Sequence, residues 1–288
     1  TTESPPMPEL TIQAVWLAAR DRLAAVSDSA ALDAQLLLTD VLGYPDRAYL
    51  FTHPERTLTA EQAAHYAALI QRRADGEPVA YLRGFRDWYD RQIIVTPAVL
   101  IPRPETELLL EMALAYARPL SALTAADIGT GSGALAVTFA AHTPQAAVYA
   151  VDISAAALDV ARRNTEAANV RVTLLQGDLL APLIAQGIKL DLLLANLPYI
   201  ASDAVPPLEV ARHEPILALD GGADGLTLIR RLLADAPQVC QPHALILLEI
   251  GMDQGAAVLA LVDELLPHAH ADIVPDYSGR DRFARVTL

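Results

Sequence analysis

The chain has 288 residues, of which 53% are hydrophobic and 19% charged, and its formal net charge is -14. This composition, without any low-complexity tract, indicates a globular protein with a sizeable core. The acidic balance argues against unaided affinity for long nucleic acid, which depends on Lys and Arg contacts to phosphate, but it is compatible with a basic protein partner.

Three features of the sequence concern its compartment. Cys240 is the only cysteine, so no intrachain disulfide can form and a reducing environment is expected. The opening TTESPPMPEL has no basic start and no apolar segment, so we expect no signal peptide. No apolar run reaches the roughly 20 residues that a membrane helix needs. We therefore expect a cytoplasmic protein with no membrane contact.

The N-terminal part shows helical spacing of apolar residues. LTIQAVWLAARDRLAAV follows a helical period, as does SAALDAQLLLTDVLG, which stops at Gly43, a residue suited to a helix C-terminus. TLTAEQAAHYAALIQRRADG opens with Thr59 and Gln62 at the spacing of a capping box. We predict a small all-α bundle over residues 1–85, which by itself indicates no function.

The composition changes between residues 84 and 107. This segment, GFRDWYDRQIIVTPAVLIPRPETE, is rich in aromatic and β-branched residues, which indicates an extended or hairpin linker over residues 86–104, which contain Pro102 and Pro104. We place a domain boundary here and expect the second domain to span residues 105–288.

Helical and strand patterns alternate in this second domain. A helix near 105–118 is followed by strand TAADIG, helix ALAVTFAAHT, strand AAVYAVDI, helix AAALDVARRNTEAAN and strand VTLLQGD, with late strands ALILLEI and FARVTL. Short apolar strands separated by helices predict an α/β fold whose parallel sheet is covered on both faces.

A glycine-rich segment follows the first of these strands. It is DIGTGSG, with Asp127, Gly129, Thr130, Gly131, Ser132 and Gly133 as candidate ligand-binding residues. Glycines there allow a tight turn and a close approach of backbone N–H groups to a ligand. Gly129, Gly131 and Ala134 also fit the dinucleotide pattern G-x-G-x-x-A, with Asp152 about 20 residues later, so the segment predicts a site without choosing its ligand.

Two more strands end in carboxylates. Asp152 ends AVYAVD, where it can accept ribose hydroxyls or cap the helix that follows Ser154. Asp178 ends LLQGD, where its carboxylate and the N–H of Leu179 can meet an adenine edge, or where it can be a turn aspartate beside Gly177. Open α/β sheets bind ligands at such carboxyl ends of strands.

The stretch LLLANLPYIA runs an apolar strand into Asn196, Leu197, Pro198 and Tyr199. Four segments, DIGTGSG, AVDIS, GD and NLPY, follow one another in this order. Their order and spacing resemble those of the class I S-adenosylmethionine-dependent methyltransferases. NLPY itself resembles the (D/N)PPY motif used to methylate planar amino groups. The resemblance implies a Rossmann-like, mostly parallel sheet with an antiparallel late strand, and S-adenosylmethionine as cofactor with S-adenosylhomocysteine as product. The implied cofactor-binding residues are Asp127, Gly129, Thr130, Gly131, Ser132, Gly133, Asp152, Asp178, Leu179 and Asn196.

Other segments narrow the resemblance. IPRPETE, DAQLLL, EPVAYLRG, RHEPILALDGGADGL and LLEIGMDQG resemble the release factor glutamine methyltransferases, the HemK/PrmC family, over nearly the whole chain. The resemblance implies methylation of the side-chain amide nitrogen of the glutamine in the Gly-Gly-Gln motif of peptide chain release factors. We expect release factors as partners, no direct contact with nucleic acid, and a monomer.

The four residues of NLPY are the predicted catalytic and substrate-binding residues. Asn196 and the Leu197 carbonyl can accept the two N–H groups of an amide, and Tyr199 can stack on its plane. The family usually has a proline where this chain has Leu197, but Pro198 biases that residue toward an extended backbone, so its carbonyl can keep the same direction.

Several readings stay open at this point. A nucleic-acid adenine methyltransferase would use Asn196 and Tyr199 on an exocyclic amine, and NLPY also occurs in rRNA adenine dimethyltransferases; a non-catalytic S-adenosylmethionine-binding protein is the third reading. Arg103 and Glu105 can line the site mouth or form a surface pair. His268 and His270 have a metal-binding spacing but lack further ligands, so we expect no metal.

Overall fold

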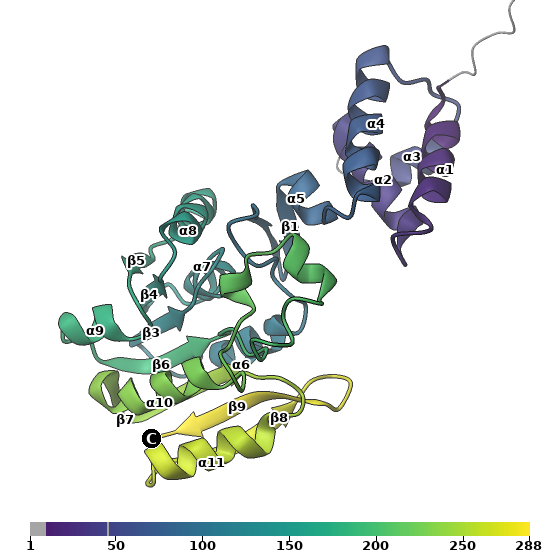
Figure 1. Ribbon diagram of the computed structural model, residues 1–288. Helices are drawn as coiled ribbons and strands as arrows, with labels where there is room; N and C mark the ends of the chain where they lie inside the picture. The colour runs from purple at the N-terminus through teal and green to yellow at the C-terminus, as the bar shows by residue number, and fades with distance from the viewer. Residues whose placement is uncertain (1–9, 45) are drawn as a thin grey trace, which may run out of the picture. The chain divides into compact units, whose positions relative to one another are not determined.

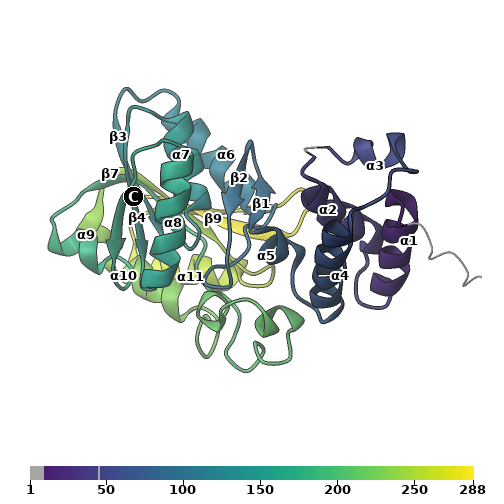
Figure 2. The same ribbon diagram turned by 90° about the horizontal axis from the view of Figure 1, so that it is seen from above.

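The computed structural model describes residues 10–44 and 46–288. Contacts divide the chain into two compact units, Thr1–Gly84 and Phe85–Leu288, which Figure 1 and Figure 2 show from two directions. The expectation about a signal peptide concerns mainly residues 1–9, which lie outside the described part. Within that part, no helix combines the length and the apolar character needed to cross a membrane.

The N-terminal unit is helical. Its described helices are α1 (Ile12–Leu23), α2 (Ala30–Leu42), α3 (Ala48–Thr52), α4 (Ala60–Ala74) and α5 (Val79–Arg83). The predicted capping box is confirmed, because Thr59 accepts from the N–H of Gln62 while the Gln62 side chain accepts from the N–H of Thr59. Gly43 ends α2 in the left-handed conformation. Leu37 and Leu38 are fully buried in a core that belongs to this unit alone.

A hairpin opens the second unit. Strand β1 (Phe85–Trp88) pairs with β2 (Arg91–Ile94) in antiparallel register, within the segment predicted as an extended or hairpin linker. Asn164 fixes this hairpin to the larger unit, since its side chain accepts from the N–H of Ile94 at 2.7 Å and donates to the carbonyl of Ile94 at 2.9 Å. The hairpin is therefore part of the second unit.

A seven-stranded sheet forms the centre of the second unit. Its strands are β3 (Leu123–Ile128), β4 (Ala146–Asp152), β5 (Thr173–Gln176), β6 (Leu190–Ala195), β7 (Cys240–Glu249), β8 (His270–Pro275) and β9 (Asp281–Thr287). Their order is β5-β4-β3-β6-β7-β9-β8. The strands from β5 to β7 are parallel, whereas β9 is antiparallel to both β7 and β8. The prediction of a mostly parallel sheet with an antiparallel late strand is confirmed.

Helices cover both faces of this sheet. They are α6 (Thr106–Ala117), α7 (Ala134–His142), α8 (Ala155–Ala167), α9 (Ala181–Ala185), α10 (Thr227–Val239) and α11 (Gly255–Leu265). Helix α7 contacts both α6 and α8, and helix α10 contacts both α9 and α11. Each group of three therefore forms one layer (Figure 1). Short 3-10 turns span Glu209–Arg212 and Ile216–Ala218. The strand order reverses between β3 and β6, and such a switch point leaves a crevice at the carboxyl ends of the strands.

Candidate active site

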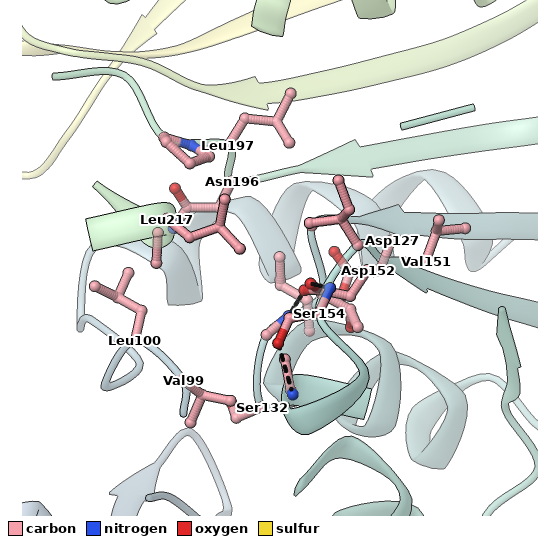
Figure 3. A pocket seen from close by; sticks show the side chains of 18 of the residues that line it. Val99, Leu100, Asp127, Ser132, Val151, Asp152, Ser154, Asn196, Leu197 and Leu217 are labelled. Atoms are coloured by element: carbon pink, nitrogen blue, oxygen red, sulfur yellow. Dashed lines mark hydrogen bonds between the residues drawn. The ribbon is translucent and has the colours of Figure 1, made fainter. Parts of the chain in front are cut away.

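A cavity of about 280 Å³ lies at these carboxyl ends. Most residues predicted from the sequence line it: Asp127, Gly129, Thr130, Gly131, Ser132, Asp152, Asp178, Leu179, Asn196, Leu197 and Pro198. Figure 3 shows the side chains of Asp127, Asp152 and Ser154 gathered at one side, with Asn196 and Leu197 on another. Gly133 and Tyr199 are not among the lining residues.

The backbone angles and close contacts of the turn between β3 and α7 explain why it is rich in glycine. Gly129, Gly131 and Gly133 have φ of 73°, 54° and 79°, a region in which only glycine is free of steric cost. A Cβ on Gly129 would lie 2.9 Å from the side chain of Leu197, and one on Gly133 would lie 3.1 Å from Ala161. A Cβ on Gly131 would meet nothing within 4 Å. Gly129 and Gly133 thus permit packing, while Gly131 leaves its backbone open to the cavity.

Asp152 holds this turn from the neighbouring strand. Its Oδ2 accepts from the N–H of Gly131 at 2.8 Å, and its Oδ1 accepts from the N–H of Ser154 at 2.9 Å. Burial raises the pKa of Asp152, while the backbone donors lower it. The side chain that caps α8 is that of Ser154, which accepts from the N–H of Ala157. Asp152 is therefore not the N-cap, and its carboxylate remains at the cavity wall.

Asp127 lies beneath the turn. Its side chain is buried and accepts from the hydroxyl of Thr130 at 2.6 Å and from the N–H of Ala136 at 3.3 Å. Burial raises the pKa of Asp127 to about 6, and the charge of Asp152 adds to that rise, while the two donors oppose it. Asp127 therefore serves to hold the turn from beneath.

The end of β5 contributes an ion pair. Asp178 accepts from Arg231 of α10 at 2.6 Å, and both side chains line the cavity while remaining about half exposed. Leu179, which follows, has a φ of 48°, an unfavourable conformation for a residue with a Cβ. Arg231 was not predicted from the sequence, because it lies on a helix 53 residues away from its partner.

Asn196 is anchored by two residues that the sequence did not single out. Its Nδ2 donates to the hydroxyl of Thr106 at 3.1 Å, and that hydroxyl donates to Glu249 at 2.7 Å. Thr106 begins α6 and Glu249 ends β7; both are buried. Burial raises the pKa of Glu249 to about 7, and the Thr106 hydroxyl opposes the rise. The segments PRPETE and LLEIGMDQG, quoted earlier only as resemblances, supply these two side chains.

A second carboxylate joins two loops at the cavity mouth. Glu214 is buried and accepts from the N–H of Ile101 at 3.0 Å and from Arg103 at 2.6 Å. Arg103 lines the cavity, and its carbonyl accepts from the indole N–H of Trp88 at 2.9 Å. Arg103 therefore lines the mouth and also forms an ion pair. Glu105 does not line the cavity.

The remaining walls of the cavity are largely apolar. Val99 and Leu100 line it from the loop after the hairpin, and Leu217 lines it from the 3-10 turn Ile216–Ala218 (Figure 3). Leu217 and its neighbour Ile216 are each 59% exposed, so this turn presents apolar side chains to solvent beside the cavity. Tyr199 is half-buried outside the lining, and burial raises the pKa of its hydroxyl.

These features fit S-adenosylmethionine. The open backbone of Gly131 can approach the ligand, and the Asp152 carboxylate at the tip of β4 has the chemistry to accept from a ribose diol. Asp178 and the backbone of Leu179 stand at the next strand, and apolar side chains can surround a base. Among residues 10–44 and 46–288, no group of three or more His, Cys, Asp or Glu side chains gathers in a way that would hold a metal.

Comparisons with known proteins agree with the fold and this site. The chain matches the family models described as PrmC N-terminal domain, over residues 15–84, and Methyltransferase small domain, over residues 104–212. The delta-N METTL16 MTase domain, a solved structure, matches with a TM-score of 0.50 at 17% identity, covering 68% of this chain and 87% of that chain. At this identity the match concerns the fold alone. Fold and site define a class I methyltransferase, whose methyl donor is S-adenosylmethionine.

Several curated proteins are more similar to the chain in sequence than this structure is. A release factor glutamine methyltransferase of Moorella thermoacetica is 45% identical over 273 residues, which cover 94% of this chain and 95% of that protein. A protein of the same name from Bacillus subtilis is 37% identical over 255 residues, 86% of this chain and 88% of that one. The chain belongs to the release factor glutamine methyltransferase family.

Proposed function

We propose that the protein transfers a methyl group from S-adenosylmethionine to the side-chain amide nitrogen of the glutamine in the Gly-Gly-Gln motif of peptide chain release factors. The observation that supports this most directly is the amide of Asn196. Its NH₂ group is committed to Thr106, which leaves its oxygen as an acceptor at a cavity suited to the methyl donor. The family membership of the chain supports the same substrate.

Methyl transfer to an amide depends mainly on how the site orients the amide nitrogen. A primary amide nitrogen is a poor nucleophile, because its lone pair is delocalised into the carbonyl. Asn196 Oδ1 accepts one of its hydrogens and the Leu197 carbonyl accepts the other, so that the lone pair faces the cofactor. When bound, S-adenosylmethionine supplies an electrophilic methyl group. Correct orientation can contribute roughly 7–11 kcal/mol in favourable cases. Methylation makes the nitrogen's proton acidic, so the site needs no strong base.

The residues after Asn196 complete this arrangement. The side chain of Leu197 is buried and packs against the glycine turn, which gives a reason for a leucine at this position in place of the family's usual proline. Pro198 lines the cavity and restricts Leu197 to an extended backbone. We assign Tyr199 to the plane of the substrate amide, which requires its ring to reach the cavity when substrate is present.

The N-terminal helical unit, residues 1–84, docks the body of the release factor in this proposal. A three-residue motif offers little binding area, so a second contact is needed. The unit has a core of its own and exposes Phe51, which is 59% accessible and contacts Trp16 edge to face. It also contributes to the net negative charge of the chain, which suits a basic partner surface. We place this activity in the cytoplasm, where release factors work, and expect the protein to act as a monomer without binding nucleic acid directly.

The test incubates the full-length protein with S-adenosylmethionine labelled at the methyl group. The acceptors are a purified release factor, the same factor with the motif glutamine replaced by alanine, and a structured RNA. We expect label on the glutamine of the intact factor alone, located by mass spectrometry. Asn196→Ala should lower turnover by orders of magnitude while calorimetry still detects cofactor binding. Label in the RNA alone would instead indicate the adenine methyltransferase reading, and label in none of the three acceptors would contradict the proposal.

A further inference from the structure

Glu249 is a buried carboxylate that is not among the predicted cofactor-binding, catalytic or substrate-binding residues. It is 2% exposed at the end of β7 and accepts a hydrogen bond from Thr106 at 2.7 Å. A carboxylate so far from water is costly unless it is paired or has a function. Its position one hydroxyl away from Asn196 connects it to the proposed site.

The hydrogen-bond chain has a direction. A threonine hydroxyl carries one proton, and that of Thr106 goes to Glu249, which as a carboxylate can only accept. The oxygen of Thr106 is then left with lone pairs toward Asn196, so it can receive only the NH₂ side of that amide. A flipped amide would place two acceptors against each other. Amide orientation usually has to be assigned from such partners, and here the charge of Glu249 fixes it.

The surroundings of Glu249 act on its pKa in both directions. Burial has the largest effect and raises the pKa, and the charge of Glu105 adds to the rise, whereas the Thr106 hydroxyl, Arg282 of β9 and Arg103 oppose it and stabilise the ionised form. The Nε of Arg282 lies 3.6 Å from the Oδ2 of Asp276, so Arg282 also forms an ion pair with that residue. Burial raises the pKa of the Tyr199 hydroxyl, and the charge of Glu249 adds to that rise.

We propose that Glu249, acting through Thr106, is a positioning residue that holds the Asn196 amide with its oxygen directed at the substrate. This inference rests on the proposed function of Asn196 as an acceptor. Glu249 touches no reacting atom; it sets which end of the amide faces the glutamine nitrogen. Without it the site would present a mixture of donor and acceptor, and only the acceptor orientation activates an amide nitrogen.

The test compares four variants by kcat and by cofactor affinity. Thr106→Val keeps the shape of the side chain but removes the hydroxyl, and Glu249→Gln removes the charge that gives the chain its direction. Both should lower kcat at least about tenfold, with the cofactor Kd changed less than twofold. Thr106→Ser keeps the hydroxyl and should rescue most of the lost turnover. Thr138→Val is the matched control, because Thr138 is fully buried and its hydroxyl has no partner among the described residues.

The pH profile separates positioning from simple damage. At saturating substrates, wild-type kcat should fall as the pH is lowered through about 7, where Glu249 takes up a proton, because a neutral acid no longer imposes a direction on Thr106. The Glu249→Gln variant should be slow throughout and lack this fall. Normal kcat in Thr106→Val or in Glu249→Gln, or a fall with pH that persists in Glu249→Gln, would overturn the inference.

A readout that needs no turnover keeps this inference distinct from the proposed function. In asparagine-labelled protein, the Asn196 side-chain amide signals are assigned by their loss in Asn196→Asp. One of the two Nδ2 protons should exchange slowly with solvent in the wild type, and both should exchange fast in Thr106→Val. If the wild type fails to methylate release factors but shows this protection, the substrate proposal is wrong and the anchoring stands. Equal exchange in wild type and Thr106→Val contradicts the anchoring itself.

Discussion

The carboxylate of Asp152 at the tip of β4 accepts a hydrogen bond from the backbone N–H of Gly131, 21 residues earlier, at 2.8 Å. The same side chain is thus both the clamp of the glycine turn and the candidate ribose acceptor. A change at this residue should therefore affect cofactor binding twice, once through the lost contact and once through the loosened turn.

Asp152→Ala should weaken S-adenosylmethionine binding roughly 10- to 100-fold, because a lost charge-assisted hydrogen bond costs about 1.5–3 kcal/mol. Isothermal titration calorimetry measures the change. Asp159→Ala is the control, since Asp159 lies on the following helix, is largely exposed and forms an ion pair with Arg162, away from the cavity lining. Equal affinities for the two variants would mean that Asp152 has no part in cofactor binding.

Gly129→Ala should destabilise the protein more than Gly187→Ala does. Both glycines have positive φ, so each alanine costs about 1–2 kcal/mol from the left-handed backbone. At Gly187 the new Cβ meets nothing within 4 Å, whereas at Gly129 it lies 2.9 Å from Leu197, which must move. Urea unfolding of both variants isolates the contact. A difference near zero would show that Leu197 moves aside without cost.

Asp127 should impose a pH dependence on stability. Its pKa is raised from 3.8 to about 6, so between these values the folded protein holds a proton that the unfolded chain has released. The free energy of unfolding therefore falls as the pH rises from about 4 to about 6, by about 3 kcal/mol from this residue. Asp127→Asn cannot titrate, so its stability relative to wild type should improve over this window. Denaturant unfolding of both proteins at several pH values measures the change, and parallel curves would contradict it.

The pair of Arg103 and Glu214 should respond asymmetrically to mutation. Arg103→Ala leaves the buried Glu214 carboxylate without its cation, a loss of about 3–5 kcal/mol for buried pairs, reduced here because Arg103 is 37% exposed. Glu214→Gln leaves only a partly exposed guanidinium and still accepts from Ile101, so it should cost less. The variant that combines Arg103→Ala with Glu214→Gln should recover part of the stability lost in Arg103→Ala alone. Melting curves of the wild type, the two single variants and the double variant, analysed as a double-mutant cycle, measure this recovery. Additive effects would mean that the two side chains do not interact.

Removal of residues 1–84 should leave a second unit that folds and binds cofactor, because each unit has its own core. Methylation of an intact release factor should fall steeply, while a short Gly-Gly-Gln peptide should be methylated equally by both forms. With the full-length protein, added salt should slow association with the factor, since complementary charge acts mainly on the encounter rate. Unchanged catalytic efficiency of the truncated protein toward the intact factor would leave the helical unit with a purely stabilising role.

The sequence allowed most of the fold to be predicted for a physical reason. Parallel strands buried on both faces read as short apolar runs, and the glycine turn needs residues that tolerate positive φ, so both leave local marks. The edge strand β8 leaves a weaker one, since its residues are partly exposed, and it was not predicted.

The parts of the site that escaped prediction depend on distant contacts. Thr106 and Glu249 are 143 residues apart, and Arg103 and Glu214 are 111 residues apart. A buried threonine at a helix start or a glutamate at a strand end has no local signature that distinguishes it from a surface residue. Only the folded sheet brings these side chains together.

The position of β9 has a consequence for the synthesis of the chain. This strand follows β8 in sequence, yet it lies between β7 and β8 in the sheet (Figure 1). Until residues 281–287 have been made and have left the ribosome, β7 lacks its neighbour on this side and β8 has no strand to pair with. Glu249 pairs in register with Phe283, so the backbone at the end of β7 also gains its partner strand only at that stage. Until then the nascent chain presents the unpaired edge of β7, the kind of edge to which a strand of another chain can add.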